Sequence, residues 1–156
     1  MATEVAARPL GVRPEIALTE AQRQTLQALQ DYDLAPIRER LVKEGAMPST
    51  WVDEAVLEFR RYLALRTLFP GTSLQMFSRQ IDAVWHTCLL FSRKYADWCN
   101  LAFGQFVHHE PATAPMTPPE AEHEWQAFAD AYGRAFGPLP RLWQMAKPTP
   151  HDTYVD

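Results

Sequence analysis

The sequence predicts an all-α protein, a single-domain bundle of about six helices with an extended N-terminal arm. Apolar residues recur at helical spacing through most of the chain, and helix-capping residues stand before several of these stripes. No segment shows sustained period-two alternation, the pattern typical of a half-buried strand. The length of 156 residues fits one domain that is large enough to bury a core.

Three parts of the chain differ in their patterning. Residues 1–18 lack sustained periodicity and contain Pro9, Gly11 and Pro14, which predicts an extended arm. Residues 19–146 contain all the helical stripes and are expected to form the helical domain. Residues 147–156 are polar and are expected to form a loose C-terminal tail.

The first three helices have clear boundary signals. Thr19 with Gln22 makes a capping box for the first helix. Proline at the start of the second predicts a helix over 36–44 that stops at Gly45. A long apolar stripe predicts the third helix over 51–69, ended by the Pro-Gly pair that follows it.

Three further helices are expected in the second half of the chain. The patterning places the fourth and fifth over 73–91 and 92–107, followed by a proline-rich loop over 111–116. Thr117 with Glu120 makes a second capping box, which opens a sixth helix ending at Phe136. A late tryptophan, Trp143, is expected to anchor the C-terminal segment on the bundle.

Charge and hydropathy exclude two classes of partner. The net charge is −4 with acidic and basic residues mixed, so no polybasic run predicts nucleic-acid binding. No apolar run approaches the ~18 residues of a membrane span, and no apolar signal segment follows the N-terminus. These features predict a cytoplasmic protein whose two cysteines are reduced. They leave its oligomeric state open.

The candidate site begins with a carboxylate and an imidazole on one predicted helix. Asp82 and His86 are four residues apart and therefore only ~40° apart around the helix, one turn along. Val84 and Cys88 lie on the opposite arc, which is the expected core face. The pair should therefore lie at the edge of the core, where two such side chains can bind one side of a metal ion.

Further ligands are expected from the end of the next predicted helix, where His108, His109 and Glu110 follow one another. Two histidines and a carboxylate suit zinc, or non-haem iron in a facial triad. Open coordination positions would then admit water or a small-molecule substrate. Glu110 would be a fourth ligand or a general base. The residues do not define a reaction.

Two other interpretations of the same residues stay open. Asp82 could accept a hydrogen bond from His86 or Trp85 and brace a helical hairpin, with the later histidines complementing a helix dipole. The protein would then be a non-catalytic adaptor whose function is a protein partner or self-association. Its arm, through Leu10 and Val12, could lie in a groove of its own bundle or of a neighbour.

The cysteines and one arginine pair have simpler interpretations. Cys88 points ~200° away from His86 on a regular helix, which disfavours a nucleophile pair. Cys99 falls on an apolar stripe, so both cysteines are expected to be buried, although thiol chemistry at Cys99 is a third functional hypothesis. The adjacent Arg60 and Arg61 are expected to lie on a solvated helix face.

The motif Asp82-Ala-Val-Trp-His-Thr, followed by Tyr95, Cys99, Phe103-Gly104 and His108-His109-Glu110-Pro111, resembles the glycine-rich domain-containing protein-like family. The similarity covers about residues 50–143 and points to a small stand-alone bacterial member. The resemblance implies functional positions but no activity, and it singles out Asp82, Trp85, His86, Gly104, His108 and His109. Many members have a second histidine where this chain has Cys88.

Overall fold

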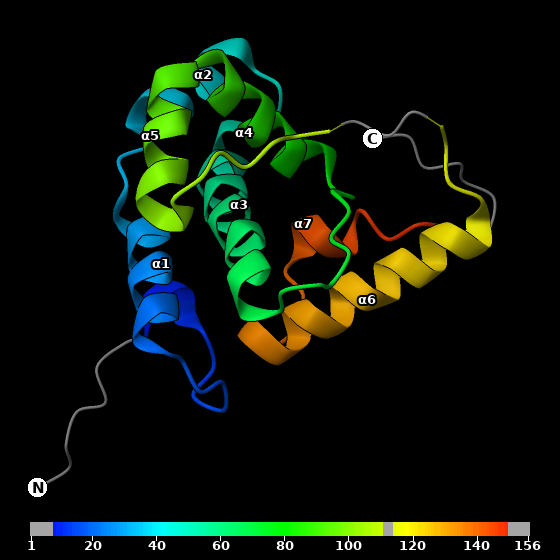
Figure 1. Ribbon diagram of the computed structural model, residues 1–156. Helices are drawn as coiled ribbons and strands as arrows, with labels where there is room; N and C mark the ends of the chain where they lie inside the picture. Colours follow the sequence, from blue (N-terminus) through cyan, green and yellow to red (C-terminus); the bar gives the residue numbers. More distant parts are fainter. Residues whose placement is uncertain (1–7, 111–113, 150–156) are drawn as a thin grey trace, which may run out of the picture.

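The computed structural model describes residues 8–110 and 114–149. Within these residues it contains seven α-helices and no β-strand, which confirms the all-α, single-domain prediction (Figure 1). Residues 1–7 of the expected arm, 111–113 of the expected loop and 150–156 of the expected tail lie outside the described residues. The elements, in chain order, are η1 Pro9–Gly11, α1 Glu20–Asp31, α2 Ala35–Glu44, α3 Ser49–Leu68, α4 Arg79–Leu90, α5 Ser92–Phe103, α6 Pro118–Phe136 and α7 Arg141–Gln144.

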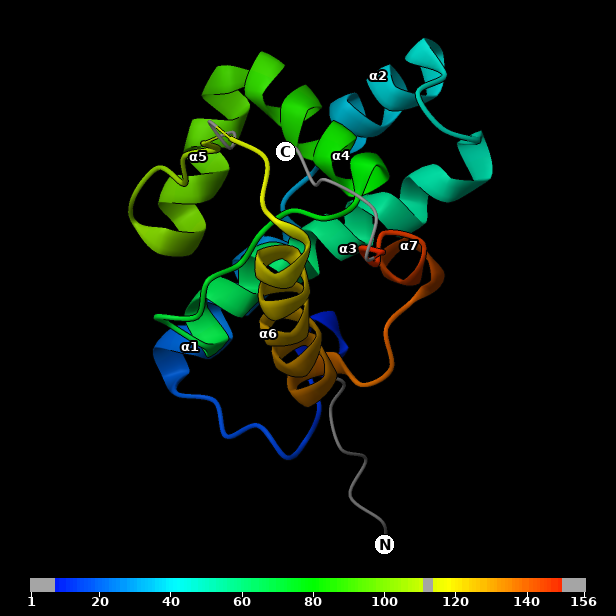
Figure 2. The same cartoon turned by 90° about the vertical axis from the view of Figure 1, so that its right-hand side faces the viewer.

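Helix α3 is the centre of the molecule. It contacts α1, α2, α4, α6 and η1, while α1 and α5 lie on one side of it and α6 and α7 on the other (Figures 1 and 2). A helix packed on several sides must bury more than one stripe. In agreement, ten of its residues are buried, including Phe59 and Tyr62.

The predicted capping signals are confirmed at three boundaries. In α1 the Thr19 side chain accepts from the backbone N–H of Gln22, and the Gln22 side chain accepts from that of Thr19. The same reciprocal pair, Thr117 and Glu120, opens α6. Gly45 ends α2 in the left-handed region with φ 66°, a conformation that favours glycine.

Two predicted boundaries are wrong. The fourth helix begins at Arg79, because Ser78, rather than Ser73, is its N-cap and accepts from the backbone N–H of Ile81. Residues 72–78 instead form a connection without helix that buries Met76 and Phe77. The fifth helix ends at Phe103 and not at Val107, because Gly104 adopts φ 71° and turns the chain out of the helix.

A buried carboxylate on α3 connects three distant parts of the chain. Glu58 is 3% exposed and accepts hydrogen bonds from the Tyr132 hydroxyl at 2.5 Å and from the Trp143 indole N–H at 3.0 Å. Arg61 lies 3.2 Å from the other Glu58 oxygen and also donates to the backbone oxygen of Leu10. Glu58 therefore fixes α6 and α7 directly on α3, and Arg61 fixes the N-terminal segment. The expected anchoring role of Trp143 is confirmed.

The prediction of a solvated face for Arg60 and Arg61 is wrong. Arg60 donates to the backbone oxygens of Leu29, in the last turn of α1, and Tyr32, its C-cap, and Arg61 pairs with Glu58. A charged side chain gains little from such partners when water competes, but much when it is partly buried. Both arginines thus connect α3 to the segments around it.

Two other predictions concern burial and membranes. Leu10 and Val12 of the N-terminal segment are buried in the protein's own core, and both cysteines are free and buried. The burial predicted for the cysteines is confirmed. Among the described helices, none combines the length and apolarity that crossing a membrane requires.

We expect Tyr132→Phe to lower the free energy of unfolding by about 1–3 kcal/mol, because it removes a donor from a buried carboxylate. Tyr32→Phe is the matched control, since its hydroxyl binds the exposed Asp97 and water can replace it, at a cost below about 1 kcal/mol. Urea unfolding of both variants measures the difference. Equal losses would mean that the Glu58 network does not stabilise the fold more than a surface hydrogen bond does.

Candidate metal centre

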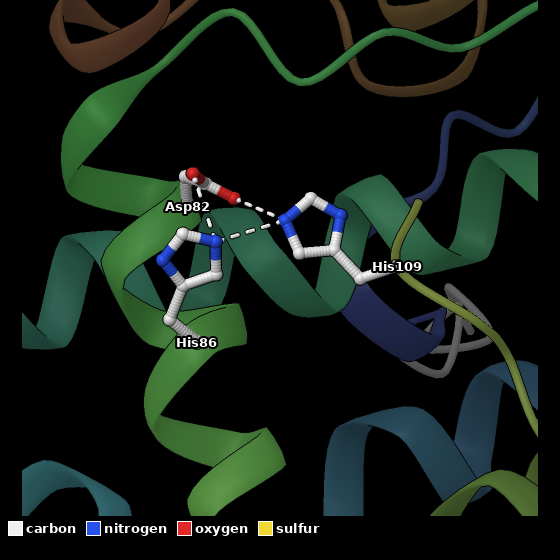
Figure 3. Close-up of side chains that lie close together, drawn as sticks. All are labelled: Asp82, His86 and His109. Carbon is white, nitrogen blue, oxygen red and sulfur yellow. Dashed lines mark hydrogen bonds and ion pairs between the residues drawn. The ribbon is translucent and has the colours of Figure 1, made fainter. Parts of the chain in front are cut away.

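Asp82 and His86 lie one turn apart on α4, as their spacing predicts (Figure 3). Ile81, Val84 and Trp85 on the neighbouring faces of the helix are buried. This geometry places the carboxylate and the imidazole at the edge of the core. The Asp82 side chain is 17% exposed, and that of His86 is 60% exposed.

The chain after α5 brings a second histidine to this pair. Gly104 reverses the direction of the chain, and residues 105–110 run without helix past α4 (Figure 1). His109, at the end of this segment, points toward Asp82 and His86 (Figure 3). Its side chain is 5% exposed, so it is the buried member of the cluster.

A chain of two hydrogen bonds holds this segment in place. The indole N–H of Trp85 donates to the Tyr95 hydroxyl at 2.9 Å, and that hydroxyl donates to the backbone oxygen of Val107 at 2.6 Å. Two residues further on, the ring of His109 stacks on Trp85 with centroids 4.1 Å apart. Burial raises the pKa of Tyr95, so the hydroxyl stays protonated as a donor. Trp85 and Tyr95 thus position His109.

The donor atoms of the three side chains converge on one point. Nε2 of His86 lies 2.9 Å from Nε2 of His109 and 3.3 Å from Oδ2 of Asp82, and Nε2 of His109 lies 3.0 Å from Oδ1 of Asp82. Ligand atoms around a tetrahedral zinc ion, at 2.0–2.1 Å from it, are separated by ~3.3 Å. The cluster therefore has almost the spacing of three metal ligands.

Hydrogen bonds among the three side chains cannot pair all of their nitrogen and oxygen atoms well. A neutral imidazole has one N–H, so an Nε2–H of His109 aimed at Asp82 cannot also bond well to His86. Oδ1 of Asp82 is buried and, despite its distance of 3.0 Å from His109, has no hydrogen bond of acceptable geometry. A cation between the three side chains would give every one of these lone pairs a partner.

Burial raises the pKa of the Asp82 carboxyl, and the nearby His86 and His109 oppose this only in part. Burial disfavours the charged form of an acid unless a positive charge compensates it. Without such a charge, the ionised Asp82 therefore costs folding free energy. This is the expected property of a carboxylate retained for binding and not for stability.

The other two predicted ligands are not in the cluster. The metal-ligand spacing among the described residues brings together Asp82, His86 and His109 only. His108 is exposed and its ring contacts Phe106, with centroids 4.8 Å apart, because successive residues of an extended segment point in opposite directions. Glu110 is exposed and lines an adjoining cleft.

That cleft has a volume of about 740 Å³ and is open to solvent. Its walls are the end of α3, the connection over 72–78 and the segment over 103–110, and its lining includes Arg66, Trp85 and His109. His109 therefore belongs both to the cluster and to the cleft. Asp82 and His86 do not line the cleft, so His109 is the side chain through which the cleft and the cluster adjoin.

Two important residues were not found from sequence. Tyr95 was named only as part of the family motif and was given no role, because its hydrogen bonds depend on the path of the chain after Gly104. Arg66 lies in the last turn of α3, where a basic residue normally complements the helix dipole. Its place in the cleft depends on segments remote in sequence.

Burial also raises the pKa of Cys88 to about 12, which removes it as a nucleophile.

A family model described as UCP032817-like matches residues 22–129, more than half of the chain. The match includes most of α1, all of α2 to α5, the whole cluster and most of α6. No curated protein and no solved structure matches the chain significantly.

This match corrects the resemblance proposed from sequence. The glycine-rich domain-containing protein-like family is not the family that the chain matches, and nothing else found points to it. The resemblance relied on a few spaced residues in two short segments. Such a pattern reflects the local geometry of a site, which is a weaker criterion than similarity along the chain.

We expect Asp82→Asn to be at least as stable as the wild type near neutral pH in the presence of chelator. The raised pKa means that the native state binds a proton more tightly than the unfolded state. Wild-type stability from this group is therefore present at low pH and falls as pH rises from its ordinary pKa of 3.8 through the raised value. The amide lacks this fall.

Urea unfolding across this pH range, beside an Asp130→Asn control on the exposed face of α6, measures the effect. A clear loss of stability in Asp82→Asn near neutral pH would show instead that the carboxylate braces the two segments.

Proposed function

The chain belongs to the UCP032817-like family, and we propose that it is a metal-binding protein that holds one divalent ion, zinc or iron, between Asp82, His86 and His109. The convergence of two imidazole nitrogens and a carboxylate within 2.9–3.3 Å of one another is the observation that supports this most strongly. The buried Oδ1 of Asp82, which accepts no hydrogen bond, adds to it.

The donor set limits the choice of ion. Imidazole and carboxylate ligands suit zinc and iron, while oxygen-only sets suit magnesium and calcium. Three protein ligands leave at least one coordination position for water or substrate, as in catalytic zinc sites and in iron facial triads. We propose that this position serves metal-dependent chemistry on a small molecule in the adjoining cleft.

The order of exposure among the ligands fits this arrangement. His109 is fixed by its stack on Trp85 and by the Tyr95 hydrogen bond to Val107, whereas His86 is the solvent-facing member. A site with one rigid, buried side and one exposed side can exchange its ion and its ligands with solvent. The residues around Asp82 exclude water from it, and the lower local dielectric strengthens an ionic bond to a metal there.

The adaptor hypothesis receives less support. It used the N-terminal segment as a docking element, but Leu10 and Val12 are buried in the protein's own core. The backbone oxygen of Leu10 also accepts a hydrogen bond from Arg61. This segment therefore contributes to the protein's own fold in the residues that the structure describes.

Elemental analysis of protein purified without chelator or a histidine tag tests the proposal. We expect about one equivalent of zinc or iron, and an affinity lowered more than ~100-fold in His86→Ala and His109→Ala, since even loss of an outer-shell partner costs about 10–100-fold. His108→Ala is the matched control and should keep the ion. Folded protein without metal, or full affinity in His109→Ala, would contradict the proposal.

We expect Tyr95→Phe to lower metal affinity about 10–100-fold while keeping the stoichiometry, because it frees the segment that positions His109. Titration of the chelator-treated protein with zinc measures the affinity, and circular dichroism verifies the fold. Tyr32→Phe is the control, because the Tyr32 hydroxyl bonds to the backbone oxygen of Lys94 and to Asp97 on α5 and not to any residue of the cluster. Unchanged affinity in Tyr95→Phe would show that the hydrogen bonds serve packing alone.

A further inference from the structure

Arg66 differs from the other two arginines of α3. The guanidinium groups of Arg60 and Arg61 donate to backbone oxygens and to Glu58. Arg66 is half-buried, yet no hydrogen bond or ion pair to it is found among residues 8–110 and 114–149, and its Nε is fully buried without a partner. Its terminal guanidinium nitrogens are not among the buried atoms and have no hydrogen bond within the described residues, so they are available to a ligand.

Arg66 lines the cleft beside the metal cluster. Its guanidinium carbon lies 5.9 Å from the centre of the Trp85 ring, and His109 stacks on the same ring. The cleft volume of about 740 Å³ falls within the range of small-molecule sites, about 300–1,000 Å³. A ligand that reaches Arg66 would therefore also lie near the cluster.

The charges and shapes around the cleft indicate which kind of ligand group the Arg66 guanidinium suits. Among the described residues that line the cleft, Arg66 is the one arginine or lysine and Glu110 is the one carboxylate. A single planar guanidinium next to a negative charge suits a monoanionic, planar carboxylate better than a phosphate dianion. The lining also contains apolar side chains, among them Leu74, Phe103 and Phe106, which suit an apolar body.

We propose that the cleft binds a small carboxylate-bearing molecule with an apolar part, and that Arg66 binds its carboxylate group. The two terminal nitrogens of the Arg66 guanidinium, which are not among its buried atoms, donate to the two carboxylate oxygens. The identification of this molecule as a substrate rests on the proposed metal function, but its binding requires only Arg66 and the cleft.

Nuclear magnetic resonance on the full chain tests this binding, with benzoate as the probe and chelator present. The Nε–H signal of Arg66, assigned by its absence in Arg66→Gln, should move saturably with benzoate. The neutral isostere benzamide should bind at least ~10-fold more weakly, because it offers the Arg66 guanidinium no ionised oxygen. Inorganic phosphate should also bind at least ~10-fold more weakly, because it has no apolar body and its second negative charge is repelled by Glu110. The Trp85 indole signal should move in parallel.

Variants separate recognition from folding. Arg66→Gln should lower benzoate affinity at least ~10-fold, and Arg66→Lys should keep the preference for benzoate over benzamide more weakly. Arg93→Gln, on an exposed part of α5, is the control and should bind benzoate as the wild type does. Equal binding of benzoate and benzamide, tighter binding of phosphate, or full affinity in Arg66→Gln would each overturn the proposal.

The same samples separate the two proposals. Zinc binding by Arg66→Gln at one equivalent, together with its loss of benzoate binding, supports both sites as distinct. Benzoate binding by a wild type that binds no metal would refute the metal centre and leave the carboxylate site standing. Zinc binding without any benzoate response would refute the carboxylate site alone.

Discussion

The buried carboxylate of Glu58 is the point on which the arrangement of the helices depends. A charge taken out of water needs several well-placed donors, and Glu58 has them from Arg61, Tyr132 and Trp143. These donors come from α3, α6 and α7, so satisfying one carboxylate fixes three elements. The aromatic core continues from there, since Tyr62, one turn further along α3, packs between Trp143 and Trp85.

That core has a second function, because Trp85 belongs both to it and to the candidate site. One side of the tryptophan packs on Phe59 and Tyr62, and its ring also stacks with His109. Its N–H begins the hydrogen-bonded chain through Tyr95 to Val107. The rigidity of the core is thereby transmitted to one ligand of the cluster. Close packing permits few alternative positions for a side chain held in this way.

The polar groups of the molecule fall into two sets. Glu58, Arg60 and Arg61 are partly or fully buried and have partners from the protein itself. Asp82 and Arg66 are also partly buried, but Oδ1 of the first and Nε of the second have no hydrogen bond. A third such atom, Oε2 of Glu124, lies on α6. Asp82 and Arg66, which have opposite charges, each lie near one member of the Trp85–His109 stack: Asp82 is 3.0 Å from His109, and Arg66 is 5.9 Å from the centre of the Trp85 ring. Proteins tolerate unfavourable features, such as buried polar atoms without hydrogen bonds, mainly at functional sites. Function is therefore expected in this region.

Local sequence determined most of the secondary structure and half of the site. Capping boxes, helix-stopping glycines and the i, i+4 spacing of Asp82 and His86 act within one or two turns, so they are legible without the fold. The choice of His109 over His108 and Glu110 was not legible. It depends on the end of α5 at Gly104 and on the hydrogen bond from Tyr95 to the backbone oxygen of Val107. Together these set the directions of the side chains that follow Val107.

Tertiary structure likewise decided the roles of Arg61 and Arg66, two arginines of α3 that differ in their hydrogen bonding. Arg61 has partners on segments far away in the chain, whereas the Nε of Arg66 has none. Helical periodicity cannot predict this difference, because it relates only residues of the same helix. The family suggested by the short motif was wrong for a related reason, because a few spaced side chains describe a local geometry and not a whole fold. The sequence by itself therefore determined the helices and the Asp82–His86 pair. Only the packing of remote segments decided which histidine completes the cluster and which arginine of α3 has no hydrogen bond within the described residues, because those contacts join residues that no local pattern relates.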